Sequence, residues 1–280
     1  MQDFAGRTGF ITGGASGIGL ALARAFASEG MNLVLADIEA PALDAAVASL
    51  SATNASVRGV HCDVADAASM QQAARIAFDS FGKVHVLCNN AGVSRAGPVE
   101  TVAETDWDWV VGVNLRGTVH GIQAFLPHMK AHGEPAHIVN TASIAGLLGG
   151  ALSGPYAATK FGIVGLSEVL AAELAGTPVG VSVLCPSWVQ TRMLDNGRNR
   201  PERFGGAFDL ASDTANAERN ARYAAALRGA KDPAEVAQLV LNAIRAGRRY
   251  VFTHANMRDE VARRFAAILA DFDALDGDAA

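Results

Sequence analysis

The stretch from Thr12 to Gly19 reads TGGASGIG, and it separates an apolar run at residues 7–11 from the helix-prone segment LALARAFASEG. Gly13, Gly17 and Gly19 fit a tight turn in which backbone N–H groups and the start of a helix face the same space. A pyrophosphate suits such a turn, since side chains there would block its approach. Glycines also end strands for structural reasons alone, but this placement between a first strand and a first helix predicts a nucleotide-binding turn.

The rest of the chain continues the alternation of strand and helix that begins at this turn. Short β-prone runs are separated by Ala-rich segments of helical period. The expected strands lie at residues 7–11, 32–36, 57–61, 84–88, 136–140, 179–184 and 249–253. Because strands that alternate with long helices imply crossover connections, we predict a doubly wound parallel β-sheet of about seven strands with helices on both faces. The whole chain, residues 1–280, is predicted to form this single α/β domain.

One helix illustrates the pattern, ADAASMQQAARIAFDSFG at residues 65–82. Asp66 stands near its expected start and Gly82 at its expected end, the positions that favour these residue types. Met70, Ala74 and Ala77 form an apolar stripe between them, so this face is predicted to be buried.

Composition and charge narrow the class of protein. Half of the residues are apolar, 18% are charged and the formal net charge is -5, without a long basic run. These values argue against binding of nucleic acid or of an anionic membrane surface. The first residues lack the features of a signal peptide, and no apolar run approaches the ~18 residues of a membrane span. We therefore expect a cytoplasmic protein whose partners are small molecules.

The cysteines and histidines predict neither a disulfide nor a metal site. Cys62, Cys88 and Cys185 are odd in number, far apart and close to apolar strand-like runs, which indicates buried free thiols. The seven histidines have no spacing typical of zinc ligands, so no metal is predicted.

The segment from Arg192 to Asp232 departs from the strand–helix rhythm. It is polar, rich in Arg, Asn, Gly and Asp, and offers no convincing strand. A long irregular insertion after a strand, at the edge of the sheet where ligands bind, is typical of a lid or a substrate loop. The alternative is a solvated excursion without a role in binding.

Asp37 lies at the end of the second expected strand, 18 residues past Gly19. This spacing is close to that of an acidic residue that accepts hydrogen bonds from an adenosine ribose. A carboxylate there repels a 2′-phosphate, and Ser16, Ala36 and Ile38 supply no basic side chain to reverse that preference. The prediction is therefore NAD and not NADP; the alternative is that Asp37 merely caps the next helix.

A phenol and an amine lie four positions apart in SGPYAATKFG, residues 153–162. If Pro155 opens a helix, Tyr156 and Lys160 project from one face, one turn apart. A phenol with a pKa near 10 is a poor base at neutral pH, and a neighbouring cation favours its charged form. We expect Lys160 to lower the pKa of Tyr156 and make it a working base.

A set of short motifs extends this arrangement over nearly the whole chain. They are TGGASGIG (12–19), Asp37, CDV (62–64), NNAG (89–92), Asn114 in VNLRG, Ser143 in TASIAG, YAATK (156–160) and PSWVQTRM (186–193). Several are weak individually, but their order is specific, as is the position of Ser143 thirteen residues before Tyr156. In this arrangement the chain resembles the short-chain dehydrogenase/reductase family, which implies a Rossmann-type fold.

The resemblance implies which residues contact the dinucleotide. They are Gly13, Ser16, Gly17, Ile18 and Gly19 in the turn, Asp37 and Ile38 at the adenosine ribose, Asp63 and Val64 beside the adenine, Asn90, Ala91 and Gly92 beside the cofactor ribose, Pro186, Val189 and Thr191 toward the carboxamide and phosphates, and Tyr156 with Lys160. The implied cofactor is NAD.

The resemblance also implies the reaction, an interconversion of a secondary alcohol and a ketone with hydride transfer to or from nicotinamide. Tyr156 would be the acid or base, and Ser143 would hold the substrate oxygen. Lys160 would tune the phenol and bind the nicotinamide ribose, while Asn114 would kink its helix and bind a water that links Lys160 to solvent.

One motif departs from the family pattern. The family usually has Pro-Gly where this chain has Pro186-Ser187, and a Cβ there is expected to alter substrate fit more than hydride chemistry. The adjacent Trp188 is interpreted either as a wall of the substrate pocket or as a core residue.

The substrate itself is open to two interpretations. A looser likeness to bacterial enzymes that act on bulky aryl-alkyl or terpenoid alcohols, together with Leu147, Leu148 and Leu152, favours an apolar substrate. Arg192 and Arg198 leave room for an acidic one.

The family's four-helix interface predicts a homodimer or homotetramer. In this chain Trp107 and Trp109 are expected at the start of the first of the two helices that would form it.

Two other functions remain open from the sequence. An NAD-dependent epimerase or dehydratase also carries Tyr and Lys four apart, although such chains are usually longer. A redox-sensing NAD-binding module would keep the fold without catalysis, but it has no need of Asn114, Ser143, Tyr156 and Lys160 together.

Overall fold

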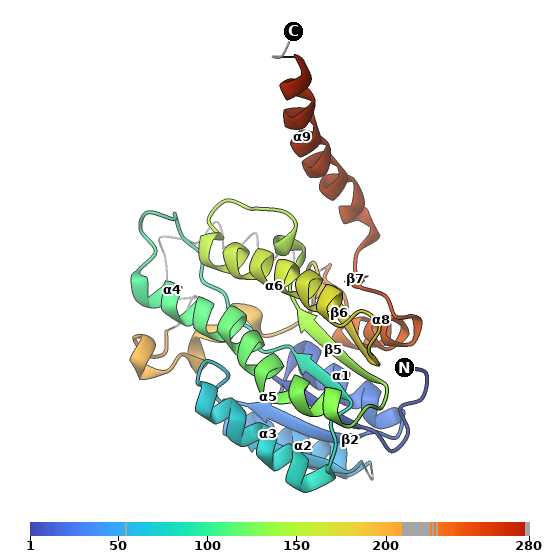
Figure 1. Cartoon of the computed structure of the whole chain (residues 1–280). Helices are drawn as coiled ribbons and strands as arrows, with labels where there is room; N and C mark the ends of the chain where they lie inside the picture. Colours follow the sequence, from blue (N-terminus) through green and yellow to red (C-terminus); the bar gives the residue numbers. More distant parts are fainter. Residues whose placement is uncertain (54, 209–224, 226, 228, 278–280) are drawn as a thin grey trace.

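The computed structural model describes residues 1–53, 55–208, 225, 227 and 229–277 (Figure 1). Within them one seven-stranded sheet has the order β3-β2-β1-β4-β5-β6-β7, and all neighbouring strands pair in parallel. The strands are β1 (Thr8–Thr12), β2 (Asn32–Asp37), β3 (Val57–His61), β4 (Val86–Asn89), β5 (Ala136–Thr141), β6 (Val179–Cys185) and β7 (Tyr250–Phe252). Every expected strand is present, so the predicted doubly wound α/β fold is confirmed.

Helices cover both faces of this sheet. One core lies under α1 (Gly17–Ser28), α2 (Ala40–Ser51) and α8 (Pro233–Ala246). The opposite core lies under α3 (Ala67–Phe81), α5 (Gly117–Ala131) and α6 (Gly154–Glu173). Side chains alternate between the two faces along each strand, and β1 therefore sends Ile11 into the first core and Phe10 into the second.

Local sequence signals fix the helix ends as expected. The Asp66 side chain accepts a hydrogen bond from the backbone N–H of Ala68 at the start of α3, and Gly82 ends this helix at a positive φ of 75°. Met70, Ala74 and Ala77 are buried. Pro155 lies in the first turn of α6, where its missing N–H costs no helical hydrogen bond.

A single helical stretch connects β4 to β5 across the second face. It consists of α4 (Glu104–Val110), the π-helical turn η1 (Val111–Arg116) and α5. The π-helical turn is the helix irregularity expected around Asn114.

The segment after β6 folds back over the carboxyl ends of the strands. Its described part contains the short 3₁₀ helices η3 (Met193–Asn199) and η4 (Glu202–Phe204). Part of the predicted lid, at residues 209–224, 226 and 228, lies outside the described residues. Ion pairs join the segment to the body, from Arg198 to Glu39, from Arg203 to Asp63 and from Arg200 to Asp106.

The last helix, α9 (Arg258–Gly277), follows β7 and a short turn η7 (Ala255–Met257). Figure 1 shows it projecting away from the sheet and its covering helices. The sequence after Asp232 thus forms helix, strand and helix, as expected.

Other features expected from composition concern cysteines, metals and membranes. Cys62, Cys88 and Cys185 are buried free thiols, as predicted. Among the described residues, no cluster of three or more His, Cys, Asp or Glu side chains could hold a metal ion. None of the helices in the described part of the chain is long and apolar enough to cross a membrane.

Candidate active site

A cavity of about 1090 Å³ lies at the carboxyl ends of the strands. It exceeds the roughly 300–1,000 Å³ of a typical ligand pocket, which suits a site for two molecules. Its lining includes all residues that the sequence assigned to the nucleotide or to catalysis, except Gly19 and Asn114. The fold therefore brings residues from positions 13 to 191 into one place.

The glycine turn closes tightly on the turn that follows β4. Gly13 has a φ of +63°, and a Cβ on it would lie 2.9 Å from the Cα of Ala91. Gly17 has a φ of +52° and faces Thr191, whose Cγ2 would lie 3.0 Å from an added Cβ. Gly19 is buried against the turn itself, because a Cβ there would lie 2.0 Å from the carbonyl oxygen of Gly13. Its absence from the cavity wall follows from this packing role.

The start of α1 is suited to an anion. Ser16 occupies the N-cap position, but its side chain makes no capping hydrogen bond, whereas α3 and α8 are capped by Asp66 and Asp232. Ser16, Gly17 and Ile18 line the cavity, so the positive end of the α1 dipole faces it. Backbone N–H groups and a helix N-terminus together are the donor set that a pyrophosphate requires.

Thr12 joins the glycine turn to the turn after β4, a role that sequence reasoning missed. Its hydroxyl accepts hydrogen bonds from the backbone N–H of Asn90 at 2.9 Å and of Ala91 at 3.0 Å. The side-chain amide of Asn90 donates in return to the backbone carbonyl oxygen of Thr12 at 3.1 Å. The sequence feature that could have indicated this role is the hydroxyl side chain of Thr12 in the last position of the strand, directly before the glycines.

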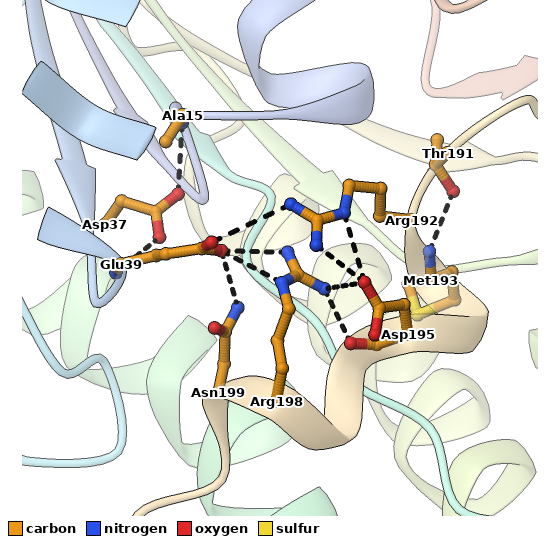
Figure 2. Close-up of polar contacts among 9 residues, drawn as sticks. All are labelled: Ala15, Asp37, Glu39, Thr191, Arg192, Met193, Asp195, Arg198 and Asn199. Atoms are coloured by element: carbon orange, nitrogen blue, oxygen red, sulfur yellow. Dashed lines mark hydrogen bonds and ion pairs between the residues drawn. The ribbon is translucent and has the colours of Figure 1, made fainter. Parts of the chain in front are cut away.

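Asp37 lies at the carboxyl end of β2, beside the glycine turn. One carboxylate oxygen accepts a hydrogen bond from the backbone N–H of Ala15 at 3.0 Å, and the other accepts one from that of Glu39 at 3.0 Å (Figure 2). Each oxygen keeps lone pairs for a further donor, such as a ribose hydroxyl. Asp37 lines the cavity and does not cap α2, whose N-cap is Glu39.

Ser143, Tyr156 and Lys160 meet at the other end of the cavity. Ser143 follows β5, and its oxygen is held by the N–H of Ala145 at 3.1 Å. Tyr156 and Lys160 project from the first turns of α6, and the Lys160 nitrogen lies 5.4 Å from the centre of the Tyr156 ring. The buried Lys160 ammonium donates to the carbonyl oxygen of Thr141 at 2.9 Å.

Burial controls the protonation of both titratable groups. It raises the pKa of Tyr156, and a hydrogen bond with the Ser143 side chain offsets this only in part. Burial lowers the pKa of Lys160 to about 8. The expectation that Lys160 lowers the phenol pKa is not met in this structure, because loss of hydration disfavours the charged form of each group.

Asn114 lies behind the cavity and not in its wall. Its side-chain oxygen accepts from the N–H of Val93 at 2.8 Å, and its amide donates to the Val93 carbonyl oxygen at 2.9 Å and to the Thr159 hydroxyl at 3.1 Å. A Cβ on Gly92 would lie 3.5 Å from both the Asn114 oxygen and the Lys160 nitrogen. These two atoms therefore border the same small space.

The residues that line the cavity near Ser143 and Tyr156 differ in part from those expected from the sequence. Trp188 lines the cavity and is 41% exposed, which favours the pocket interpretation over the core one. Ser187 also lines it, with its backbone N–H bonded to the hydroxyl of Thr253. The leucines at 147, 148 and 152 do not line the cavity; the apolar lining comes instead from residues that include Val93, Ile144, Leu194, Leu227 and Met257.

Arg192 and Arg198 line the cavity at the end where Asp37 lies and pair with Glu39, so they do not form an acidic-substrate site beside Tyr156. Sequence reasoning missed Glu39. It stands two residues past Asp37, but no local pattern links it to Arg198, which is 159 residues away.

Comparison with known proteins identifies close relatives of the chain. The family model of the short chain dehydrogenases matches residues 7–202. A short chain dehydrogenase/reductase from Burkholderia phymatum, solved in complex with NAD, superposes with a TM-score of 0.91, is 42% identical and covers 97% of both chains. A C alpha-dehydrogenase of Sphingobium is 33% identical over 96% of this chain and 87% of its own length. A 1-deoxy-11-beta-hydroxypentalenate dehydrogenase of Streptomyces avermitilis is 36% identical over 92% and 88%.

The glycine turn yields a direct prediction. Gly13→Ala adds a Cβ only 2.9 Å from Ala91, so the turn must shift and lose its fit to a pyrophosphate. We expect NADH to bind at least about tenfold more weakly, measured by fluorescence titration, since overpacking costs about 1–3 kcal/mol. Gly6→Ala is the matched control, because Gly6 has a φ of +70° with no atom within 4 Å of an added Cβ. It should unfold at a lower temperature but bind NADH normally; normal binding by Gly13→Ala would contradict the assignment.

Proposed function

Because the chain belongs to the short-chain dehydrogenase family, we propose that it is an NAD-dependent dehydrogenase that interconverts a secondary alcohol and a ketone. The observation that carries the proposal is the meeting of Ser143, Tyr156 and Lys160 in the cavity that the glycine turn also borders. An acid–base group and a dinucleotide cradle are the two parts this reaction needs, since a proton moves at oxygen while a hydride moves at carbon.

Tyr156 exchanges the proton at the substrate oxygen. The phenol is protonated at neutral pH, because burial raises its pKa, and this form donates to a ketone that is being reduced. Alcohol oxidation needs the phenolate, which burial disfavours in the protein without cofactor. The positive nicotinamide ring of NAD+ would add to the charge of Lys160, whose nitrogen lies 5.4 Å from the centre of the Tyr156 ring, and so favour the phenolate. When bound, NAD would supply the hydride acceptor for oxidation and NADH the hydride donor for reduction.

Ser143 orients the substrate oxygen. Its own oxygen is fixed by the N–H of Ala145, and its side chain is hydrogen-bonded with Tyr156. A substrate oxygen within reach of both hydroxyls would be polarised as charge develops on it.

Asn114 and Lys160 form the proton route behind the phenol. The Asn114 side chain is held on both sides by the backbone of Val93 and by Thr159, so its oxygen keeps a fixed position close to the space that Lys160 also borders. A water there would connect Lys160 to solvent.

NAD is proposed over NADP because of Asp37. Its carboxylate stands where the adenosine ribose is expected, offers acceptors to ribose hydroxyls and repels a 2′-phosphate. The NAD complex of the Burkholderia phymatum relative supports the same choice.

The substrate is proposed to be a bulky apolar or aromatic alcohol or ketone. Val93, Ile144, Trp188, Leu227 and Met257 line the cavity. The name of one relative, a 1-deoxy-11-beta-hydroxypentalenate dehydrogenase, agrees with a large carbon skeleton, whereas a D-threitol dehydrogenase among the relatives is named for a small alcohol. The apolar lining therefore carries this part of the proposal. An acidic substrate is not favoured, because Arg192 and Arg198, the two cations that could bind it, form ion pairs with Glu39.

Residues 192–232 are proposed to be the lid of this single domain. Three ion pairs, from Arg198, Arg200 and Arg203, tie its described part to residues that follow β2, β3 and β4. A segment held across the cavity in this way excludes water from the reacting groups.

Replacing the phenol tests the assignment. Tyr156→Phe removes the hydroxyl that moves the proton, so alcohol-dependent NADH formation at 340 nm should fall by about 10²-fold or more. NADH should still bind within about threefold of the wild type, because the cradle is intact. Tyr250→Phe is the matched control, since the Tyr250 hydroxyl, on β7, donates to Glu168 on α6 and Tyr250 does not line the cavity.

A Tyr156→Phe protein with normal turnover would reject Tyr156 as the acid or base. A wild type that converts nucleotide-sugars without net NADH change would favour the epimerase reading instead, and tight NADH binding with no turnover of any alcohol would favour the sensor.

A homo-oligomer is also proposed, on the strength of α9. Large apolar side chains recur on it at helical spacing and are 39–66% exposed, namely Phe265, Ile268, Leu269, Phe272 and Leu275. The first part of the helix carries Arg258, Arg263 and Arg264 with Asp259 and Glu260, a net charge of about +1, and the later part carries Asp271 and Asp273, which are both negative. Because the charges of the two parts differ, an antiparallel α9 of a second copy would match this face. We also propose an interface at the family's four-helix face, which the resemblance places on the helical stretch from α4 to α5 and on the following helix α6. Trp109 does not contribute to it, since this residue is buried within the chain.

Charges in the apolar stripe should disrupt this pairing. The double variant Phe265→Glu, Phe272→Glu should lower the molar mass measured by light scattering after size exclusion, relative to the wild type. Ala266→Glu, Ala270→Glu adds the same charge on the other side of α9 and should leave the mass unchanged. Equal masses for all three proteins would contradict the role of α9.

A further inference from the structure

Two arginines and one glutamate form a bridge across the adenosine end of the cavity (Figure 2). Arg198 donates from Nε and Nη2 to one oxygen of Glu39, at 3.1 and 2.9 Å, and Asn199 donates to the same oxygen at 3.2 Å. Arg192 lies 3.7 Å from the other oxygen. The arginines come from the segment after β6 and Glu39 from the end of β2, so the bridge joins two otherwise separate parts of the chain.

This bridge stands directly beside Asp37. The backbone N–H of Glu39 donates to the Asp37 carboxylate, whose other oxygen is bound to the glycine turn. The side chains of Glu39 and Arg198 are only 24% and 21% exposed, so their interaction is partly shielded from solvent. Burial opposes ionisation of Glu39, but the hydrogen bonds from Arg198 and Asn199 keep its pKa below the usual value.

The charges at this end favour an uncharged ribose. Asp37, Glu39 and Asp195 carry three negative charges, and Arg192 and Arg198 carry two positive ones, which leaves a net charge of about -1. Both guanidinium groups are engaged by carboxylates. Unengaged, they would be good ligands for a phosphate, because a guanidinium binds phosphate oxygens through two parallel hydrogen bonds.

We propose that Glu39 is a second determinant of nucleotide choice, which excludes a 2′-phosphate by holding Arg192 and Arg198 and by adding a negative charge beside Asp37. The inference rests on the proposed function, because it takes the adenosine ribose to lie at Asp37. The site thus contains two cations able to bind a 2′-phosphate and two carboxylates, Glu39 and Asp195, that keep them occupied. Of the two carboxylates, Glu39 is the one whose backbone N–H is bound to Asp37.

The test is the variant Glu39→Gln, which removes the charge but keeps a side-chain oxygen for Arg198 and Asn199. The probes are adenosine 2′,5′-bisphosphate and adenosine 5′-monophosphate, whose binding is measured by calorimetry. We expect the bisphosphate to bind about tenfold more tightly to the variant than to the wild type, since one unit charge acts at short range through a partly screened medium. Binding of the monophosphate should change less than about threefold.

Two controls separate this effect from a general change of charge. Glu29→Gln breaks a comparable partly exposed pair, with Arg245 at 2.6 Å, and does not border the cavity. It should leave both affinities unchanged. Arg198→Met in the Glu39→Gln background should remove most of the gain, because the freed guanidinium is the proposed phosphate ligand.

NADH and NADPH titrations of the wild type and Glu39→Gln complete the experiment. The inference is overturned if the wild type binds NADH but Glu39→Gln binds neither the bisphosphate nor NADPH more tightly than the wild type does. The proposed function would still stand in that case. An equal gain in Glu29→Gln also overturns it. A wild type that binds neither dinucleotide overturns both proposals.

Discussion

The parallel pairing of β1 with β4 is the constraint on which the site depends. The strand order reverses at this pair, so the chain leaves β1 toward one side and β4 toward the other, and a crevice remains between the two turns. Thr12 binds the two turns together through the backbone of Asn90 and Ala91. Gly13 fits there only because it has no side chain. The start of α1, the carboxylate of Asp37 on β2 and the side chains of Tyr156 and Lys160 on α6 all line this crevice, because the sheet orders their strands and helices around it.

Charge is distributed unevenly along the crevice. At the Tyr156 end, burial disfavours the charged forms of the phenol and of Lys160, so proton transfer there responds strongly to any charge brought close to them. At the Asp37 end, Glu39 and Arg198 keep their charges because they form an ion pair that is only partly exposed to solvent. One end is therefore suited to move a proton, and the other to recognise a polar ligand and to hold the segment after β6 in place.

Local patterns in the sequence were sufficient for the sheet, for the capped helix α3 and for the placement of Asp37 at a strand end and of Tyr156 one turn before Lys160. Each of these features depends on residues close together in the chain. The motif order added Ser143 and Asn114. The bridge from Glu39 to Arg198 was not predictable, since it joins residues 159 positions apart through long side chains. The leucines at 147, 148 and 152 misled for a related reason: their apolar character is visible in the sequence, but the direction of the loop that carries them is not. The effect of burial on Tyr156 and Lys160 likewise depends on packing that no local pattern encodes.

A crystal structure of the protein soaked with NAD is the most direct measurement of the central claim, that one crevice holds the dinucleotide and the proton-transfer groups together. The account predicts the pyrophosphate at the start of α1, the adenosine ribose on Asp37 and the nicotinamide ring beside the hydroxyl of Tyr156. A nucleotide bound in the opposite direction, or with its nicotinamide ring remote from Tyr156, would contradict it.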